Sequence, residues 1–505
     1  MRPDSSDDAS GMSPHSRRQP RPFTSLATLA PFAKSAAAAL AAVLLLSCGG
    51  GGGDAGGSGP LPQTVTLTFP ANGTDGLSGI VTLGAAAAAG AGIVAVEFQI
   101  DGVAITEDTT APYAASLDTT PFSEGQHVIR ARGRDAAGSR TAWSSAVVRL
   151  ATGRAVPAGF TRNENWVGGL ANAAAFALAP DGRIFVAEQG GNLRVVKNGA
   201  LLGLPFVSLN VDSTGERGLV GVAVHPNFAS NHFVYVYYTS INGAARRNRI
   251  VRYTATADVA TDPGTPILEL PDLSGATNHN GGGMRFGPDG KLYVGVGENG
   301  RPALAQDRSH PFGKILRLND DGSTPGDNPF ATTQTGQGRL VWAYGLRNPF
   351  TFAFQPGTGR MHINDVGEET WEEIDLGAAG ANYGWPASEG FDRVGSGFTA
   401  PIFAYGHAPA TGSPPGGFFS GEAIAGGVFY PASGAGPGLF PAPWRGNYFF
   451  ADFLGRFVGL LDIGNDNAAY TFCTLSGLPV DMLVGTDAAL YVLTRGAIAR
   501  ISTTP

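Results

Sequence analysis

The chain has 505 residues, of which 43% are hydrophobic, and its formal net charge is -7. This length predicts two or three domains, and the apolar content excludes a disordered chain. The negative charge and the lack of a basic stripe argue against a nucleic-acid partner. With 74 Gly, 35 Pro and only 2 Cys, the composition suits an all-β protein with many turns and no disulfide framework.

Residues 1–47 are predicted to be an export signal, because basic residues precede the apolar run 36–46, which is too short to span a bilayer. Residues 45–48, Leu-Leu-Ser-Cys, resemble a bacterial lipobox, with cleavage before Cys48 and lipid on its sulfur. An ordinary signal peptide with an incidental cysteine is the alternative. We therefore expect an exported protein that is lipid-anchored to the bacterial outer membrane or cell surface, facing the periplasm or the exterior, with no other membrane attachment.

Residues 48–62 are mostly glycine, which predicts a flexible linker. From residue 63 to 151 the pattern changes to short alternating strands, with turn signals at Asn72-Gly73, Asp101-Gly102 and Ala137-Gly138. About seven strands in roughly 90 residues are typical of an immunoglobulin-like β-sandwich. The amino-acid sequence of this segment also resembles bacterial Ig-like modules. We expect the segment to act as a spacer.

A second pattern recurs between residues 155 and 503. A turn rich in Pro, Asp and Gly is followed by an apolar alternating strand and then by another strand. Six copies occur at irregular spacing, which predicts a six-bladed β-propeller with insertions between its blades. The copies begin within residues 179–187, 225–237, 287–294, 355–363, 444–450 and 485–492.

One stretch of this region combines a histidine with closely spaced glycines. His279 lies between Asn278 and Asn280 and precedes three glycines, 281–283, and then a predicted strand-turn-strand unit. Glycine lets a backbone approach a ligand closely, and a histidine held beside a sheet edge suits a base or a ligand. A surface histidine in a Gly-rich turn is the alternative. We interpret His225 and His362 as structural, and Trp371 and Trp385 as packing residues rather than substrate platforms.

Several ordered motifs give this region a family likeness. They are Gly215-Glu-Arg-Gly-Leu-Val-Gly221, Asn278-His279 before the glycines, Gly313-Lys-Ile-Leu-Arg-Leu318, Asp327-Asn-Pro-Phe330, Trp342-Ala-Tyr-Gly-Leu-Arg-Asn-Pro349, Asp365-Val-Gly-Glu368, Trp371-Glu-Glu-Ile374 and Asn382-Tyr-Gly-Trp-Pro386. Together they resemble the glucose/sorbosone dehydrogenase family, over nearly all of residues 155–503. The resemblance implies a soluble quinoprotein that uses PQQ and calcium on a six-bladed propeller.

By this resemblance His279 is the catalytic base that takes the proton from the anomeric hydroxyl of a sugar. An imidazole suits this step, because it accepts protons near neutral pH while a hydride leaves the same carbon. Arg347 and Asn348 match the family pair that contacts the quinone, and Arg347 would stabilise charge on the reduced oxygen. A cap that pairs with a carboxylate is the alternative for Arg347. Glu216 matches a position whose side chain contacts cofactor or sugar.

The resemblance also implies two calcium sites. The carbonyls of Gly367 and Glu368 would hold an active-site calcium, which acts as a Lewis acid on the quinone. Glu373 and the carbonyl of Tyr383 would hold a structural calcium, with Asp392 as a further oxygen ligand. Without the resemblance, we would interpret the acidic residues in segment 368–375 as the solvent-exposed face of a loop.

The chain departs from the family where cations are expected. Sugar-oxidising members carry an Arg-x-Arg before an aspartate, whereas this chain has Leu478 and Val480 before Asp481. The position of an earlier lysine falls near Leu454, and Arg456 is the expected substitute. Because PQQ carries three carboxylates, missing cations weaken its binding. This pattern is similar to the hedgehog-interacting-protein-like branch of the family.

Two functions from different classes follow. The first is an enzyme that oxidises an aldose or oligosaccharide with PQQ and calcium and passes electrons to an unidentified acceptor other than oxygen. The second is a non-catalytic propeller on the cell surface that binds a glycan or a protein. His279, Arg347 and Asn348 favour the enzyme, and Leu478 with Val480 favours the binding module.

Overall fold

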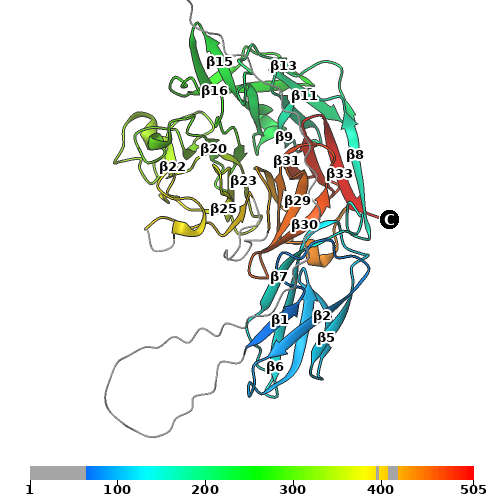
Figure 1. Ribbon diagram of the computed structural model, residues 1–505. Coiled ribbons are helices and arrows are strands. Elements are labelled where there is room, and N and C mark those ends of the chain that lie inside the picture. Colours follow the sequence, from blue (N-terminus) through cyan, green and yellow to red (C-terminus); the bar gives the residue numbers. More distant parts are fainter. Residues whose placement is uncertain (1–63, 394–396, 408–418, 505) are drawn as a thin grey trace, which may run out of the picture. The chain divides into compact units, whose positions relative to one another are not determined.

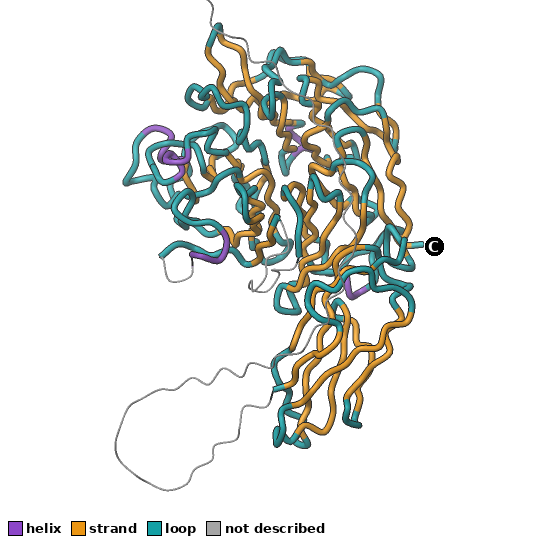
Figure 2. Tube along the Cα trace, in the orientation of Figure 1, coloured by secondary structure: helices purple, strands orange, loops and turns teal. Residues whose placement is uncertain are grey.

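The computed structural model describes residues 64–393, 397–407 and 419–504, without the side chains of residues 392 and 393 (Figures 1 and 2). The predicted signal peptide 1–47, linker 48–62 and lipid site Cys48 lie outside these residues. The described chain is built almost entirely of strands and loops, as the sequence predicts. Within it, no helix is long and apolar enough to cross a membrane.

The helical segments of this part of the chain are short and lie in connections between strands (Figure 2). They are α1 (Phe228–Asn231) and the 3₁₀ turns η1 (Pro302–Ala305), η2 (Gly336–Leu340), η3 (Gly390–Arg393) and η4 (Ala442–Trp444).

Residues 65–150 form two antiparallel sheets that share one hydrophobic core. One sheet has the order β1-β2-β5, and the other has the order β4-β3-β6-β7. The strands are β1 (Val65–Phe69), β2 (Ile80–Ala87), β3 (Ile93–Ile100), β4 (Val103–Asp108), β5 (Tyr113–Asp118), β6 (Gly125–Asp135) and β7 (Ser144–Leu150). Alternation directs side chains inward, as for Tyr113, Ala115 and Leu117 on β5, which are buried.

The Asp101-Gly102 signal becomes the two-residue hairpin between β3 and β4. Asp101 has φ 50° and Gly102 has φ 76°. Positive φ at both central residues is the requirement of a type I′ turn, whose twist matches that of the paired strands. The local sequence therefore determines this hairpin.

Residues 160–503 form six sheets of four or five strands, taken in chain order. The first three contain β9 (Ala173–Leu178), β10 (Ile184–Glu188), β11 (Asn192–Lys197), β12 (Ala200–Leu201) and β13 (Val207–Ser208); β14 (Leu219–Val224), β15 (Phe233–Asn242), β16 (Ala245–Thr256), β17 (Val259–Ala260) and β18 (Thr265–Glu269); and β19 (Met284–Phe286), β20 (Leu292–Val296), β21 (Lys314–Leu318) and β22 (Val341–Tyr344).

The next three sheets follow the same order of antiparallel neighbours. They contain β23 (Pro349–Phe354), β24 (Met361–Asp365), β25 (Trp371–Gly377) and β26 (Phe403–Gly406); β27 (Ile424–Phe429), β28 (Tyr448–Asp452), β29 (Phe457–Asp462) and β30 (Ala468–Thr474); and β31 (Pro479–Val484), β32 (Leu490–Thr494), β33 (Ala497–Thr503) and β8 (Phe160–Gly168). In the last sheet β8, the earliest strand of this region, pairs with β33, the latest (Figure 1).

The first strands of these six sheets form a closed circle of contacts. β9 contacts β14, β14 contacts β19, β19 contacts β23, β23 contacts β27, β27 contacts β31, and β31 contacts β9. The predicted Pro/Asp/Gly turns join first and second strands, and Asp181, Asp289 and Asp487 each accept a backbone N–H two residues on. Loops before each first strand and after each second strand therefore lie at one end of the circle, because the strands are antiparallel.

The N-terminal sheets contact the fifth sheet of this circle through buried polar groups. β6 packs against β30, where Ser123 Oγ donates to the Thr471 carbonyl at 2.7 Å. The Gln126 amide donates to the Ser420 carbonyl at 2.9 Å and accepts the Ser420 N–H at 2.7 Å. These hydrogen bonds link the N-terminal sheets to the fifth sheet.

Candidate functional site

A cavity of about 280 Å³ lies at one end of the circle of first strands. Its apolar wall comes from five of those strands, through Ala174, Val220, Phe350, Ile424 and Val480. Its polar lining consists of Gln189, Glu216, Asn348 and Arg495. These four residues lie in loops before a first strand or after a second strand, which is why residues far apart in sequence meet here.

His279 stands beside this cavity in a strained backbone conformation. It precedes β19, has φ 54° and is 9% exposed. A positive φ is unfavourable for a residue with a Cβ, so the surrounding contacts hold it there. The backbone N–H of His279 donates to Glu216 Oε2 at 2.7 Å, which ties the histidine to the cavity lining.

Both ring nitrogens of His279 have partners. Nδ1 pairs with Glu298, which follows β20 and is 2% exposed, and Nε2 lies 3.0 Å from the Asn278 amide nitrogen. A carboxylate at Nδ1 favours the tautomer that carries its proton there, so the Nε2 lone pair accepts a hydrogen bond from Asn278. The arrangement leaves Nε2 as the nitrogen that is able to take a proton. It contradicts the alternative of a surface histidine in a turn.

The glycines after His279 serve packing, which differs from the expectation that they admit a ligand. A Cβ on Gly281 would overlap the Gly295 carbonyl, and a Cβ on Gly283 would lie 2.7 Å from the Phe350 carbonyl. The first contact lies within the third sheet, and the second joins that sheet to β23 of the fourth sheet. The glycines thus let protein backbones approach one another and so fix the position of His279.

Arg347 and Asn348 precede β23 and are held by one buried carboxylate. Asp365, at the end of β24, accepts the backbone N–H of Arg347 at 3.0 Å and that of Asn348 at 2.7 Å. Asn348 Oδ1 accepts the Gly281 N–H at 3.1 Å, and the Glu298 N–H donates to the Arg347 carbonyl at 2.9 Å. The histidine loop and the Arg-Asn loop therefore form one connected unit.

Arg347 does not line the cavity itself. Its guanidinium donates to the Val366 carbonyl at 3.1 Å and lies 5.5 Å from the centre of the Trp385 ring. Its Nε is buried without a hydrogen-bond partner among the described residues. Trp385 is buried under this cation, and Trp371 packs against Gly390, so both tryptophans contribute to packing, as expected.

The interpretation of the acidic run as a solvated loop is wrong for its central residues. Glu372, Glu373 and Asp375 lie on β25 and are 0%, 2% and 0% exposed, because β25 is an inner strand of its sheet. Glu368, in the loop before β25, is exposed, and its N–H donates to Glu389 at 2.6 Å.

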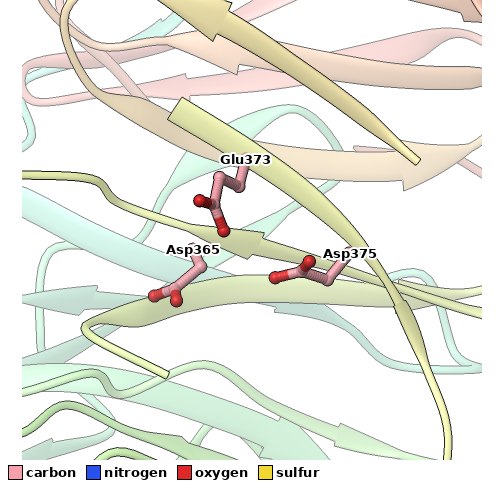
Figure 3. Close-up of side chains that lie close together, drawn as sticks. All are labelled: Asp365, Glu373 and Asp375. Carbon is pink, nitrogen blue, oxygen red and sulfur yellow. The ribbon is translucent and has the colours of Figure 1, made fainter. Parts of the chain in front are cut away.

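Three of the buried carboxylates come together across two strands. Oxygens of Asp365 on β24 and of Glu373 and Asp375 on β25 lie within 4.8 Å of one another, and Figure 3 shows the three side chains close together. Asp365 in this cluster also holds the Arg347–Asn348 backbone. Carboxylate oxygens are the ligands that calcium prefers.

The other expected metal ligands are placed as follows. Gly367 lies in the loop between β24 and β25, where a Cβ would overlap the Trp371 carbonyl. Tyr383 is fully buried, and its hydroxyl donates to the Leu376 carbonyl at 2.7 Å. Asp392 lies in η3, and its side chain is outside the described part of the structure.

Comparison with known proteins identifies the family of this chain. The family model described as Glucose / Sorbosone dehydrogenase matches residues 170–502, which is more than half of the chain. The chain belongs to the glucose/sorbosone dehydrogenase family. A second model, described as Bacterial Ig domain, matches residues 64–131.

Proteins with different names are similar to the chain. Aldose sugar dehydrogenase YliI of Escherichia coli is 30% identical over 329 residues, which are 63% of this chain and 86% of that protein. The human Hedgehog-interacting protein is 30% identical over 211 residues, 36% of this chain and 30% of that protein. The PQQ-bound form of an aldose sugar dehydrogenase from Streptomyces coelicolor superposes with a TM-score of 0.54 and 26% identity, over 69% of this chain and 100% of that one.

The expected departure from the sugar-oxidising family members is visible in the cavity. Val480 lines it and is 2% exposed, so an apolar side chain stands where a cation was expected. Arg456, the expected substitute, is exposed, donates to the Ser476 carbonyl at 3.3 Å and does not line the cavity. Leu454 is 51% exposed. Among described residues, Arg495 is the only basic side chain in the lining.

Sequence reasoning missed four residues of this site: Gln189, Glu298, Asp365 and Arg495. Glu298 and Asp365 had a local signal, because each lies at the end of the second strand of the sheet whose first strand His279 or Arg347 precedes. Gln189 and Arg495 had none, since each joins the cavity through the order of sheets around the circle.

Three other histidines of the described chain lie outside this site. His225 is buried and accepts the Asn227 N–H at 2.9 Å, and burial lowers its pKa. His362 on β24 is fully buried between Phe429 and Tyr448, and burial lowers its pKa to about 3. Both agree with a structural role. His407 pairs with Glu372 at 2.7 Å, and this hydrogen bond raises the pKa of His407.

Proposed function

We propose that this protein is a sugar dehydrogenase that uses PQQ and calcium to oxidise aldoses at the anomeric carbon, with an acceptor other than oxygen. The observation that carries the proposal is the His279–Glu298 pair, tied through Glu216 to a cavity that Asn348 and Arg495 line. A base held by a buried carboxylate beside a cavity with a few polar lining residues suits proton abstraction. Membership of the family supports the same reaction class.

The cavity lining fits a flat aromatic acid. Val220, Phe350 and Ile424 offer apolar surface, while the Asn348 amide and the Arg495 guanidinium suit carbonyl and carboxylate oxygens. In the proposal these residues hold PQQ, and the quinone carbonyls of bound PQQ would accept the two electrons of the oxidation. Arg347 would face the charge that develops on the cofactor.

In the proposed oxidation, His279, Glu298 and Asn278 have separate roles. His279 Nε2 takes the proton of the anomeric hydroxyl, while the hydride of the same carbon leaves with both electrons of the C–H bond, so the sugar becomes a lactone. Glu298 keeps the proton on Nδ1 and stabilises the imidazolium that forms. Asn278 gives up its hydrogen bond to Nε2 when the sugar hydroxyl arrives.

Calcium is placed by the same proposal at two sites near these loops. The carbonyls of Gly367 and Glu368 would hold one ion, which when bound supplies a Lewis acid. Glu373 would hold the other, with the Tyr383 carbonyl and Asp392 as predicted. The position of Asp365 and Asp375 next to Glu373 adds oxygen ligands of the preferred type.

The architecture that we propose has three parts. Residues 155–503 form a six-bladed propeller, supported by the closed circle of six first strands and by the β8–β33 pairing. Residues 63–151 form an Ig-like sandwich, supported by two sheets over one core and by the bacterial Ig match. Residues 1–47 and 48–62 are the signal peptide and the linker.

Cys48 anchors the exported protein to the outer membrane or cell surface in this proposal. The sequence order of apolar run, small residue and cysteine supports it. Cys48→Ser is expected to move the protein from the membrane to the soluble fraction, because acyl-chain burial provides the attachment. Wild type that takes up no labelled palmitate and a variant that stays with the membrane would contradict the anchor.

A non-catalytic propeller that binds a glycan or protein remains the second candidate, and Val480 in the cavity wall favours it. One experiment separates the two. Purified protein with PQQ and calcium is assayed with aldoses and an artificial electron-accepting dye, while the absorbance of the quinone is followed. Dye reduction that depends on both sugar and PQQ supports the enzyme. No PQQ bound at micromolar concentration, together with no turnover, supports the binding module.

A further inference from the structure

Arg495 is the basic residue of the described chain that lines the cavity. It follows β32, is half-buried and lines the cavity. One guanidinium nitrogen donates to the Ala173 carbonyl at 3.1 Å, and the other donates to Gln189 Oε1. Burial lowers the pKa of Arg495, so its charge is desolvated, although an arginine stays protonated at neutral pH. A cation in this setting interacts strongly with an anion that enters the cavity.

The hairpin of the last sheet brings Arg495 to the segment where cations are missing. The Arg495 N–H donates to the Leu478 carbonyl at 3.0 Å, and β31 pairs with β32 from Pro479 and Thr494 onward. Arg495 is therefore the cross-strand neighbour of Leu478, and both Arg495 and Val480 line the cavity. A guanidinium supplied from the end of β32 reaches the same end of the cavity as one supplied from the start of β31.

Gln189 connects Arg495 to the rest of the site. Its Oε1 accepts the Arg495 hydrogen bond, while its amide nitrogen donates to the carbonyls of Gly215 at 2.6 Å and Arg217 at 2.8 Å. These two carbonyls flank Glu216, whose carboxylate receives the His279 N–H. Gln189 is a positioning residue, because it fixes the guanidinium and the Glu216 loop at once.

We propose that Arg495, held by Gln189, is the carboxylate-binding subsite of the cavity. Arg495 then replaces the cations that are expected at the positions of Leu478 and Val480. The ligand class is a flat aromatic acid with at least one carboxylate. The proposal rests on the proposed function for its cofactor, PQQ, but the subsite itself is defined by the cavity. With a single cation in the described lining, one carboxylate is bound strongly and the others face uncharged surface or solvent.

The test compares two arginines that differ in place. Arg495→Gln removes the cavity cation, and Arg456→Gln removes an exposed cation of the neighbouring sheet as a matched control. Calcium-loaded apoprotein is titrated with PQQ, with its trimethyl ester and with benzene-1,3,5-tricarboxylate, and binding is followed by fluorescence quenching or calorimetry. Arg495→Lys, which keeps the charge, and melting curves of all variants control for folding.

We expect Arg495→Gln to weaken PQQ and the tricarboxylate about tenfold or more and to leave the ester unchanged, since only charged partners lose an ion pair. Arg495→Lys should retain most of the preference for PQQ over its ester, and Arg456→Gln should bind as wild type does. Equal affinity of wild type and Arg495→Gln for PQQ would overturn the subsite.

The same titrations distinguish this inference from the function that it rests on. If wild type binds the tricarboxylate in an Arg495-dependent way but not PQQ, the subsite stands and the quinoprotein function fails. If wild type binds PQQ and Arg456→Gln weakens it while Arg495→Gln does not, the function stands and the subsite is wrong. If wild type binds neither acid, the subsite is wrong.

Discussion

His279 is held from three sides before any substrate arrives. Its backbone is bound by Glu216, and its two ring nitrogens contact Glu298 and Asn278. A base that is oriented in advance loses little freedom when the reaction begins, and this lowers the barrier that binding must offset. The strained φ of 54° is the local cost of that orientation.

Removal of this base is expected to affect turnover rather than cofactor binding. His279→Ala should lower kcat by roughly 100-fold or more, as loss of a general base does, with little change in the Kd for PQQ. Glu298→Gln should lower kcat by a smaller factor, because an amide does not fix the protonated Nδ1 as a carboxylate does. Steady-state dye reduction and PQQ titration measure the two quantities. An unchanged kcat in His279→Ala would show that this histidine is not the base.

His362 gives the fold a dependence on pH that is independent of catalysis. Its pKa is lowered by burial to about 3 in the folded state, against about 6.5 when unfolded. The unfolded chain thus binds a proton below pH 6.5 that the folded chain refuses, so stability is lost as pH falls toward 3. The expected slope is about 1.4 kcal/mol for each unit of pH in this window.

Replacement of this side chain by an apolar one of similar size should remove that slope. Between about pH 6 and pH 4, the free energy of unfolding of His362→Leu is expected to depend less on pH than that of wild type. Urea unfolding at several pH values measures it. Parallel curves for wild type and variant would mean that His362 is protonated in the fold. His225→Leu is a less informative variant, because Asn227 and Asn231 bind its Nδ1.

At the scale of elements, β24 and β25 carry both packing and charge. Three buried carboxylates on these strands face one another, and Asp365 among them also supports the Arg347–Asn348 turn (Figure 3). A change in this cluster therefore reaches the cavity through a chain of hydrogen bonds, without any residue of the cluster lining it.

Calcium bound at Glu373 is expected to stabilise the fold. A ligand that binds only the folded state, at about 100 times its Kd, adds roughly 2.7 kcal/mol. Chelation with EGTA should lower the Tm of wild type, and Glu373→Gln should abolish the response. Magnesium in place of calcium serves as a control for ionic strength. A melting curve that ignores the chelator would remove calcium from the proposal.

The local parts of this fold were predictable from sequence, and the assembled parts were less so. The Asp101-Gly102 hairpin and the turns at Asp181 and Asp289 follow from backbone preferences that a few residues determine. Burial of Glu373 did not follow, since it depends on which strands flank β25. Arg495 reaches the cavity only because β31 and β9 close the circle, a relation between residues about 300 apart, as the Arg495–Gln189 bond shows.

At the scale of the whole molecule, the N-terminal sheets share buried hydrogen bonds with the fifth sheet. Gln126 is 3% exposed and makes paired bonds with Ser420, so its removal leaves buried polar groups without partners. Two modules joined in this way are expected to unfold together.

Gln126→Ala should weaken that cooperation. We expect a loss of about 1–3 kcal/mol and the separation of one calorimetric transition into two. Thr66→Ala, at an exposed position on β1, is the matched control and should melt as wild type does. Two separate transitions already present in wild type would show that the contact does not couple the modules.

The pairing of β8 with β33 constrains how the protein folds during its synthesis. Thr161 and its partner Ser502 are 341 residues apart, so a ribosome that adds about 5–20 residues per second needs roughly 20 to 70 seconds between them. During this interval the edge of β8 has no strand to accept its hydrogen bonds, and an open edge invites pairing with another chain. A nascent chain that is held unfolded until its last strand has been made avoids this hazard. Transport across a membrane before folding would provide such a delay.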